Sequence, residues 1–318
     1  MAGPRHVLSG HVPSRTEPEI PGTPSIPAAE DVLRACGAEG IAPPPTGTVE
    51  RWAWDYVCST DLDTKLTPPP PPSRWELSPP PRRLARPGRP PSLAVSQHAA
   101  KTPGPEAMRA PARRAQLVHT FLHHELQAAE LMAWALLAFP DSPRAFRGGL
   151  VHIALDEVRH MQMYSDYLAG LGHHFGDFPV RDWFWERVPA APTPAHFVAV
   201  MGVGFEGANL DHTARFAARF RAIGDEAGAA LQERVSEEEI PHVRFALRWL
   251  RRWTRPSPEG PLAPADFSTW TGHLPPPLSP VLMRGKPLDL ESRRRSGFPD
   301  PFLAELASWS EKIAAPGS

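Results

Sequence analysis

The sequence predicts an all-α fold: a four-helix bundle with a long crossover between helices 2 and 3, and proline-rich extended arms at both ends. Most of the 42 prolines among the 318 residues lie before residue 112 or after residue 255, and proline disrupts helices because it lacks a backbone donor. The stretch between has helical periodicity with three interruptions. The outer two are short and the middle one is long, which predicts antiparallel pairs joined by one crossover.

The first two helices are delimited by proline, serine and glycine. The range 112–139 has no glycine or proline, and Pro140 follows it. Ser142 and Pro143 then supply an N-cap and a first-turn proline for a second helix, which Gly172 ends.

The third and fourth helices begin in the same way after the crossover at 172–193. Thr193 and Pro194 start a helix that runs to about residue 223, and Asp225 caps a fourth that runs to about residue 253. One long crossover is the connectivity of ferritin-like bundles, and another antiparallel bundle is the alternative.

The flanking regions differ in how much apolar surface they carry. Residues 51–67 contain two tryptophans and a tyrosine, too much for a solvated tail, so this piece is expected to dock on the core. Short helices are expected at 29–36 and 301–313. The expected organisation is a largely disordered proline-rich arm at 1–50, an extended docking segment at 51–111, the bundle at 112–255 and a proline-rich extension at 256–318.

Composition excludes several classes of function. The net charge of −1 gives no electrostatic reason for binding nucleic acid or an anionic membrane. The longest apolar run, 131–139, is too short to span a bilayer, and the N-terminus lacks a secretory core, so a cytoplasmic protein is expected. Cys36 and Cys58 have no metal-like spacing and predict neither a disulfide framework nor a zinc site.

Two Glu-x-x-His motifs carry the chemical signal. Glu157 and His160 lie on the second helix, and Glu239 and His242 lie on the fourth. Three residues turn an α-helix by about 300°, so each pair projects from one face, about 60° apart. A carboxylate and an imidazole placed in this way can bind one hard or borderline metal ion.

The other two helices supply a matching acid each. Glu125 lies 32 residues before Glu157 and Glu206 lies 33 before Glu239, so the halves repeat with a shift of 81 or 82 residues. Each acid interrupts an apolar stripe, and buried carboxylates are costly unless cations neutralise them. Di-iron and di-manganese bundles use this ligand set. The sequence therefore predicts two metal ions, iron first and manganese as the alternative, and a surface ion network is the other reading.

Four further acids are expected around these ligands. Asp156 and Glu238 directly precede ligand carboxylates. The site resembles that of di-iron carboxylate enzymes, and this resemblance implies that such an acid accepts the second N–H of a ligand histidine from the opposite half; the alternative is that both are surface charges. Glu130 and Asp211 follow the first-helix and third-helix ligands by five residues, and either support the site or only solvate and link helices.

The remaining candidates have a structural alternative each. Pro241 lies within the second motif and either kinks or bulges the helix toward His242 or is simply accommodated. Tyr164 is the one catalytic candidate, for radical or proton transfer, with core packing as its alternative. His123 and His124 are either polar groups near the site or surface residues.

The runs HHELQAAEL, DEVRH, FEGANLD and EEEIPHV, preceded by the arm RPGRPPSL and the segment DLDTKL, resemble the bacterial ferritin-like family named domain of unknown function 455. The resemblance covers about residues 50–255. It implies a fold similar to tRNA-modifying di-iron hydroxylases, rubrerythrin and ferritin. Matched motif by motif, it implies metal positions at Glu125, Glu157, His160, Glu206, Glu239 and His242.

These observations favour a di-iron or manganese–iron oxidoreductase. It would activate O2 or peroxide and hydroxylate or desaturate an unknown small-molecule or tRNA substrate, with an electron donor as partner. The alternatives are a ferroxidase or iron-handling protein, and a metal-stabilised interaction protein whose proline-rich arms bind partner modules. The assembly stays open, with a homodimer among the options.

Overall fold

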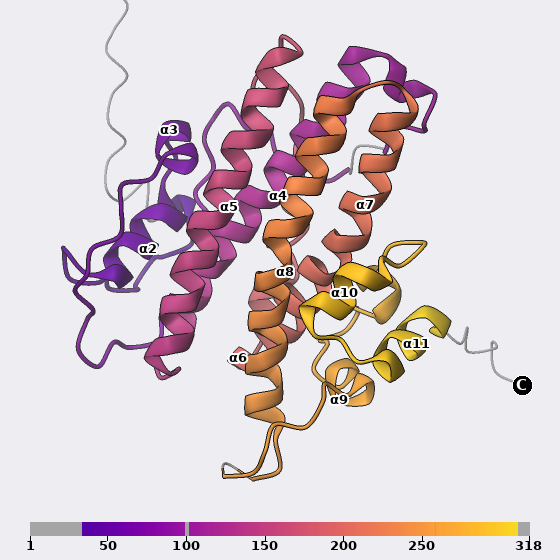
Figure 1. The fold of residues 1–318 in the computed structure, drawn as a ribbon. Coiled ribbons are helices and arrows are strands. Elements are labelled where there is room, and N and C mark those ends of the chain that lie inside the picture. The colour runs from indigo at the N-terminus through magenta and orange to yellow at the C-terminus, as the bar shows by residue number, and fades with distance from the viewer. Residues whose placement is uncertain (1–33, 99–101, 258, 311–318) are drawn as a thin grey trace, which may run out of the picture.

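The structure is a computed structural model, and it describes residues 34–98, 102–257 and 259–310 (Figure 1). In these ranges regular structure is helical, and the only β-type pairing is an isolated parallel bridge between Val95 and Val180. The all-α prediction is therefore confirmed. Among the described helices, none combines the length and apolar character needed to span a membrane.

The first pair of long helices is α4 (Pro111–Ala138) and α5 (Arg144–Gly170), which pack against each other along their length. Both begin and end within two residues of the expected positions. The predicted capping differs in one detail: Pro143, not Ser142, is the residue that precedes α5, and it provides no side-chain cap. Helix ends commonly differ by one or two residues from a sequence signal.

The second pair is built from one continuous helical path and α8 (Glu226–Thr254). That path begins as α6 (Pro194–Val198), widens into the π-helical segment η3 (Ala199–Glu206) and returns to α-geometry as α7 (Gly207–Ala222). The expected caps are present, because Thr193 accepts from the amide of His196 and Asp225 from that of Gly228. The π-helical turns lie in η3. Helix α8 continues through Pro241 as one α-helix, so no π-bulge occurs at Pro241.

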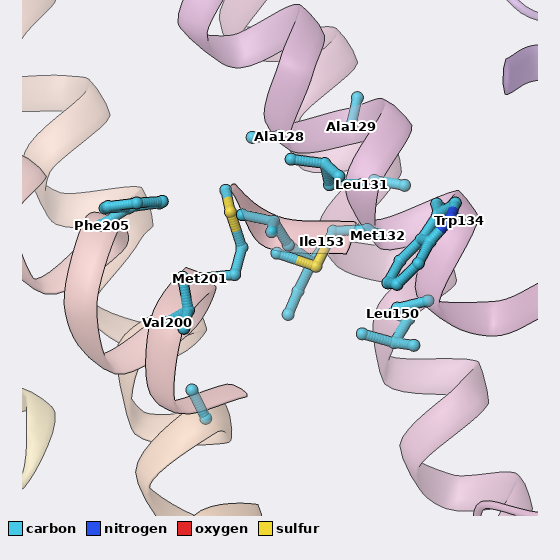
Figure 2. Close-up of a cluster of buried hydrophobic side chains, with 14 of the residues drawn as sticks. Ala128, Ala129, Leu131, Met132, Trp134, Leu150, Ile153, Val200, Met201 and Phe205 are labelled. Atoms are coloured by element: carbon cyan, nitrogen blue, oxygen red, sulfur yellow. The ribbon is translucent and has the colours of Figure 1, made fainter. Parts of the chain in front are cut away.

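Apolar side chains of η3 fill the space between the two pairs. Figure 2 shows Val200 and Met201 from η3 facing the side where Met132 of α4 and Ile153 of α5 lie, and all four are buried. The next residue of η3, Gly202, packs so closely on α8 that an added Cβ would overlap the Cβ of Ala246. The core therefore continues through all four helical paths.

The N-terminal arm covers the outer side of α4 and α5 (Figure 1). It contains α2 (Val49–Cys58), which packs on α4, and α3 (Leu62–Leu66), which packs on α5. Glu50 of α2 accepts a hydrogen bond from Arg147 of α5 inside this contact. A single turn, η1 (Ala107–Arg109), then leads into α4.

The C-terminal extension covers the other side, against α7 and α8 (Figure 1). It is more regular than its proline content suggests. Its helical pieces are α9 (Phe267–Thr271), η4 (Pro280–Met283), α10 (Leu290–Ser296) and α11 (Asp300–Ser308). The last of these corresponds to the helix expected at 301–313. Within the crossover the chain forms one further turn, η2 (Val188–Ala190).

The described part of the arm contradicts the expectation that the two cysteines do not pair. Cys36 and Ala38, which lie in the range expected to be largely disordered, are fully buried, and Cys36 forms a disulfide with Cys58 of α2. The cysteine spacing gave no sign of this pairing because the contact depends on how the arm folds back. Disulfides persist mainly in oxidising compartments, so the bond argues against the expected cytoplasmic location. Residues 1–33, with most of the helix expected at 29–36, lie outside the described residues.

Candidate metal centre

Four of the predicted ligands gather at one point inside the helices. Glu125 comes from α4, Glu157 and His160 from α5, and Glu239 from α8, and all four are buried. One ligand atom from each lies within 4.8 Å of those of the other three, so the group could hold a metal ion. The apolar helix stripes that carry these residues turn them inward together.

The two imidazoles face the same carboxylates from opposite ends. His160 Nδ1 lies 3.2 Å from Glu157 Oε2 and 3.6 Å from Glu239 Oε1. His242 Nδ1 lies 3.1 Å from Glu157 Oε1 and 3.0 Å from Glu239 Oε2. Each of these two carboxylates therefore has one oxygen near each histidine.

The other two predicted carboxylate ligands are Glu125 and Glu206, and both are buried. Glu125 Oε2 lies 3.8 Å from His160 Nδ1. Glu206, at the C-terminal end of η3, is buried, and its Oε1 has no hydrogen-bond partner. A buried carboxylate oxygen without a donor is unfavourable unless a cation contacts it.

The second nitrogen of each imidazole contacts an acid from the opposite half. His160 Nε2 lies 3.1 Å from Glu238 Oε2, and His242 Nε2 lies 3.1 Å from Asp156 Oδ2. Arg159 links the two acids, with Nη1 donating to Asp156 and Nη2 to Glu238. These contacts fix both ring planes and leave each Nδ1 turned toward the carboxylate cluster.

The pKa shifts in the cluster show that its buried carboxylates are unfavourable as uncompensated negative charges. Burial raises the pKa of Glu125 well above its usual value, and the carboxylates of Glu157 and Glu239 raise it further. Burial and the same two neighbours raise the pKa of Glu206. These two acids therefore favour their protonated form when no cation is present.

The histidines respond in the opposite direction. Burial would lower the pKa of His160, but the neighbouring carboxylates of Glu125 and Glu157 raise it well above its ordinary value. The pKa of His242 is raised against burial by Asp156, Glu157 and Glu239. The protein thus gathers protons around four carboxylates, and divalent cations would replace that charge. A set of glutamate and histidine donors suits iron and manganese, so these residues fit such a centre.

Glu130 does not contact this cluster, so of its two expected roles the linking one fits its contacts. It points toward the N-terminal arm, where its Oε1 lies 2.7 Å from Lys65 Nζ and 2.6 Å from Arg89 Nη1. Its Oε2 accepts a hydrogen bond from Trp185 Nε1. The five-residue offset from Glu125 turns this side chain about 140° away from the ligand face, so it serves to anchor the arm.

Asp211 takes the corresponding role for the C-terminal extension. Arg293 donates to both carboxylate oxygens, from Nε to Oδ1 at 2.9 Å and from Nη2 to Oδ2 at 2.7 Å. The backbone amides of Gly285 and Asp289 donate to the same carboxylate. This ion pair is fully buried, so Asp211 fixes three points of the extension on α7.

A residue outside the two Glu-x-x-His motifs adds a polar contact to the cluster. Asn209 Nδ2 donates to Glu239 Oε1 at 3.2 Å. Asn209 follows Glu206 by three residues, the same spacing that separates glutamate from histidine in both motifs. That repeated spacing is the signal that could have identified it.

A cavity of about 390 Å³ reaches the cluster from the side of the crossover. Its lining includes the ligand candidates Glu125 and Glu206, together with Tyr164. Tyr164 is buried, and its hydroxyl accepts a hydrogen bond from Gln232 at 3.2 Å. His123 and His124 also line the cavity, so they lie beside the site and not on the surface.

Fold and site together define an all-helical protein with a buried carboxylate–histidine cluster that could bind a metal. The chain belongs to the family described as protein of unknown function (DUF455), whose model matches residues 50–304. The match extends about 50 residues past the expected end of the resemblance and includes α9 and α10. No curated protein and no solved structure matches the chain.

Proposed function

We propose that this protein is a ferritin-like oxidoreductase whose cluster holds two metal ions, iron in the first place and manganese as the alternative. The observation that carries the proposal is the placement of Glu157 and Glu239, each with one oxygen toward each histidine. One mononuclear site would not need two carboxylates shared in this way.

The helix arrangement supports the ferritin-like part of the proposal. The pair α4 and α5 supplies Glu125 and one Glu-x-x-His motif, and the path η3–α7 with α8 supplies Glu206 and the other. The crossover between the pairs spans more than twenty residues, as one long connection in such bundles does.

The cavity supports substrate oxidation over iron handling. When bound, the two ions would supply the redox chemistry that activates O2 or peroxide for hydroxylation or desaturation. The protein contributes a chamber with aromatic side chains in its wall, where the rings of Phe184 and Phe205 stack at 4.8 Å. An ion-entry path would instead need carboxylates along its length, and here Glu125 and Glu206 occur only where the cavity meets the cluster.

Metal content per chain tests the proposal directly. Protein purified from iron-supplemented cells should carry about two metal ions per chain by mass spectrometry, and its reduced form should consume O2. Glu157→Ala should lose most of the metal. Glu237→Ala is the matched control, because this residue lies on α8 close to the ligands but pairs with Arg295 at the surface.

Two results would reject the proposal. One is less than about one metal ion per chain with no change in Glu157→Ala. The other is full metal loading without any O2 or peroxide consumption, which would leave a metal-stabilised scaffold.

A further inference from the structure

The cavity beside the cluster continues outward into a second, adjoining space of about 230 Å³ between α4 and α7. The two spaces share most of the outer one's walls, including Phe121, His124, Asn209, His212 and Phe216. The inner space meets Glu125 and Glu206, and the outer one is lined by Arg215. Together they form a passage from a cationic neck to the candidate metal ligands.

The inner part of the passage is shaped for an apolar group. Phe121 and Phe216 lie with ring centroids 4.9 Å apart, and Trp183 lies 5.0 Å from Phe205 on the facing wall. An apolar body buried against these rings gains the usual hydrophobic free energy. Arg181, which also lines this space, is already paired with Glu186.

The neck carries one cation with incomplete bonding. Arg215 is half-buried, its Nε has no hydrogen-bond partner, and its Nη2 contacts only the ring nitrogen of His212, at 3.0 Å. Among the residues that the structure describes, no carboxylate forms a salt bridge with Arg215. Burial and the guanidinium itself lower the pKa of His212 to about 4, so His212 stays neutral beside it. A partly desolvated guanidinium in this state gains most from an anion with two acceptor oxygens.

We propose that the passage binds an organic anion with an apolar body, whose carboxylate or phosphate pairs with Arg215. The apolar body would extend past Phe121 and Phe216 toward Glu125 and Glu206. The anion would then hold a carbon remote from the charged group next to the candidate metal ligands. The assignment of this anion as the molecule to be oxidised rests on the proposed function, whereas its binding does not.

Titration calorimetry on the iron-loaded full chain tests this with octanoate, octyl phosphate and octanol as probes. Octanoate or octyl phosphate should bind at least about tenfold more tightly than octanol, and their order distinguishes a carboxylate from a phosphate site. Arg215→Gln should weaken binding of the preferred anion by about 10- to 100-fold and leave octanol within about twofold, the effect of one charge-assisted bond.

Arg219→Gln is the matched control. Arg219 lies one turn further along α7 and its guanidinium also stacks on Phe216, at 5.3 Å against 5.0 Å for Arg215, but it does not line either space. Its loss should change each dissociation constant by less than about twofold. Arg215→Lys keeps the positive charge but loses the planar guanidinium that can donate to two oxygens at once, so it should retain part of the affinity. Lengthening the probe from butanoate to octanoate should tighten binding about fourfold per methylene.

Equal binding of octanol and both anions would overturn the proposal, as would equal losses in Arg215→Gln and Arg219→Gln. Metal content is measured on the same samples. Anion binding that depends on Arg215 in protein without metal would leave this inference standing and reject the proposed function. Full metal loading with no preference for anions would reject this inference and leave the proposed function standing.

Discussion

Two half-exposed acids contact the outward nitrogens of the cluster histidines. Asp156 and Glu238 contact the outward nitrogens of His242 and His160, and both are partly open to solvent beside Arg159. Solvent exposure makes these ion pairs weak contributors to folding. Their effect is therefore expected on the basicity and orientation of the imidazoles, and so on metal affinity.

We expect Asp156→Ala to lower the affinity for iron or manganese by about 10- to 100-fold, because the His242 ring loses the acceptor that orients it. Competition against a chelator of known affinity measures the change. Asp166→Ala is a suitable control, since Asp166 is an exposed acid further along the same helix. A loss of less than about twofold in Asp156→Ala would show that Asp156 is only a surface charge.

A different buried histidine gives the protein a pH-dependent stability. His119 is buried on α4, and its Nε2 accepts a hydrogen bond from the amide of Gly176 at 2.9 Å. Burial lowers the pKa of His119 to about 4, Asp177 raises it somewhat, and His173 lowers it. The unfolded chain binds the proton near pH 6.5, so protonation favours unfolding.

The stability that His119 contributes should therefore be complete above about pH 6.5 and be lost as the pH falls toward 4, by at most about 3 kcal/mol. Urea unfolding of His119→Gln, whose amide oxygen can accept the same bond, should show a flatter pH dependence than wild type over this range. The exposed His152 supplies the control variant, His152→Gln. Identical pH profiles for wild type and His119→Gln would contradict the assignment.

Among the elements, the π-helical segment η3 is the one that brings a ligand to the site by unusual geometry. It ends at Glu206, and π-helical turns often occur at functional sites. Two glycines allow it to pack: an added Cβ would overlap Ala246 at Gly202 and press on the sulfur of Met283 at Gly204. The wide turn is therefore held between α8 and the C-terminal extension.

Gly202→Ala should lower the free energy of unfolding by about 1 to 3 kcal/mol, because the methyl group has no space between η3 and α8. It should also weaken metal binding, since Glu206 follows within four residues. Gly148→Ala on α5 is the matched control: nothing lies near its added methyl group, and the substitution should stabilise by about 0.5 to 1 kcal/mol. Chemical denaturation measures the free energy of unfolding of both variants. If Gly202→Ala changes it by the same amount and in the same direction as Gly148→Ala, close packing at Gly202 is ruled out.

The sequence predicted the helix boundaries better than it predicted the winding inside the helices. Caps and breakers such as Pro140, Thr193 and Asp225 act locally, so their effect can be read from neighbouring residues. The π segment has no such local signal, because its geometry depends on how the glycines of η3 fit against α8 and Met283. Pro241 follows its second expected reading, because α8 accommodates it as one continuous α-helix.

At the scale of the molecule, the two arms attach at equivalent points of the two halves. Glu130 follows Glu125 by five residues and binds Lys65 and Arg89, and Asp211 follows Glu206 by five residues and binds Arg293. The repeat made this matched pair visible in the sequence. The partners were not, because they come from segments 41 to 82 residues away whose pairing is decided by tertiary packing.

The arms also show why a high proline content is compatible with short helices and buried side chains. Proline restricts the unfolded chain, so a segment rich in it loses less entropy when fixed, and a few buried groups can order it. In the C-terminal extension Phe267, Trp270 and Phe302 provide those groups, with ring centroids 5.3 to 5.5 Å apart. In the N-terminal arm the Cys36–Cys58 disulfide and the buried tryptophans of α2 do the same.

The buried pair of Asp211 and Arg293 should therefore control whether the extension stays on the helices. Asp211→Asn leaves the fully buried Arg293 without a counter-charge, and breaking a buried pair in this way costs about 3 to 5 kcal/mol. Urea unfolding should show that loss, and limited proteolysis should cut the region after residue 255 first. Asp300→Asn, which breaks an exposed pair with Arg294, should change stability by less than about 1 kcal/mol.

The double variant Asp211→Asn with Arg293→Met decides between a charge effect and simple loss of packing. Removing the uncompensated guanidinium should recover part of the stability, because methionine fills a similar volume without needing a counter-charge. If the double variant is no more stable than Asp211→Asn alone, the destabilisation comes from the lost bonds to the amides of Gly285 and Asp289. In that case Asp211 anchors the extension by binding these two backbone amides and not by its ion pair with Arg293.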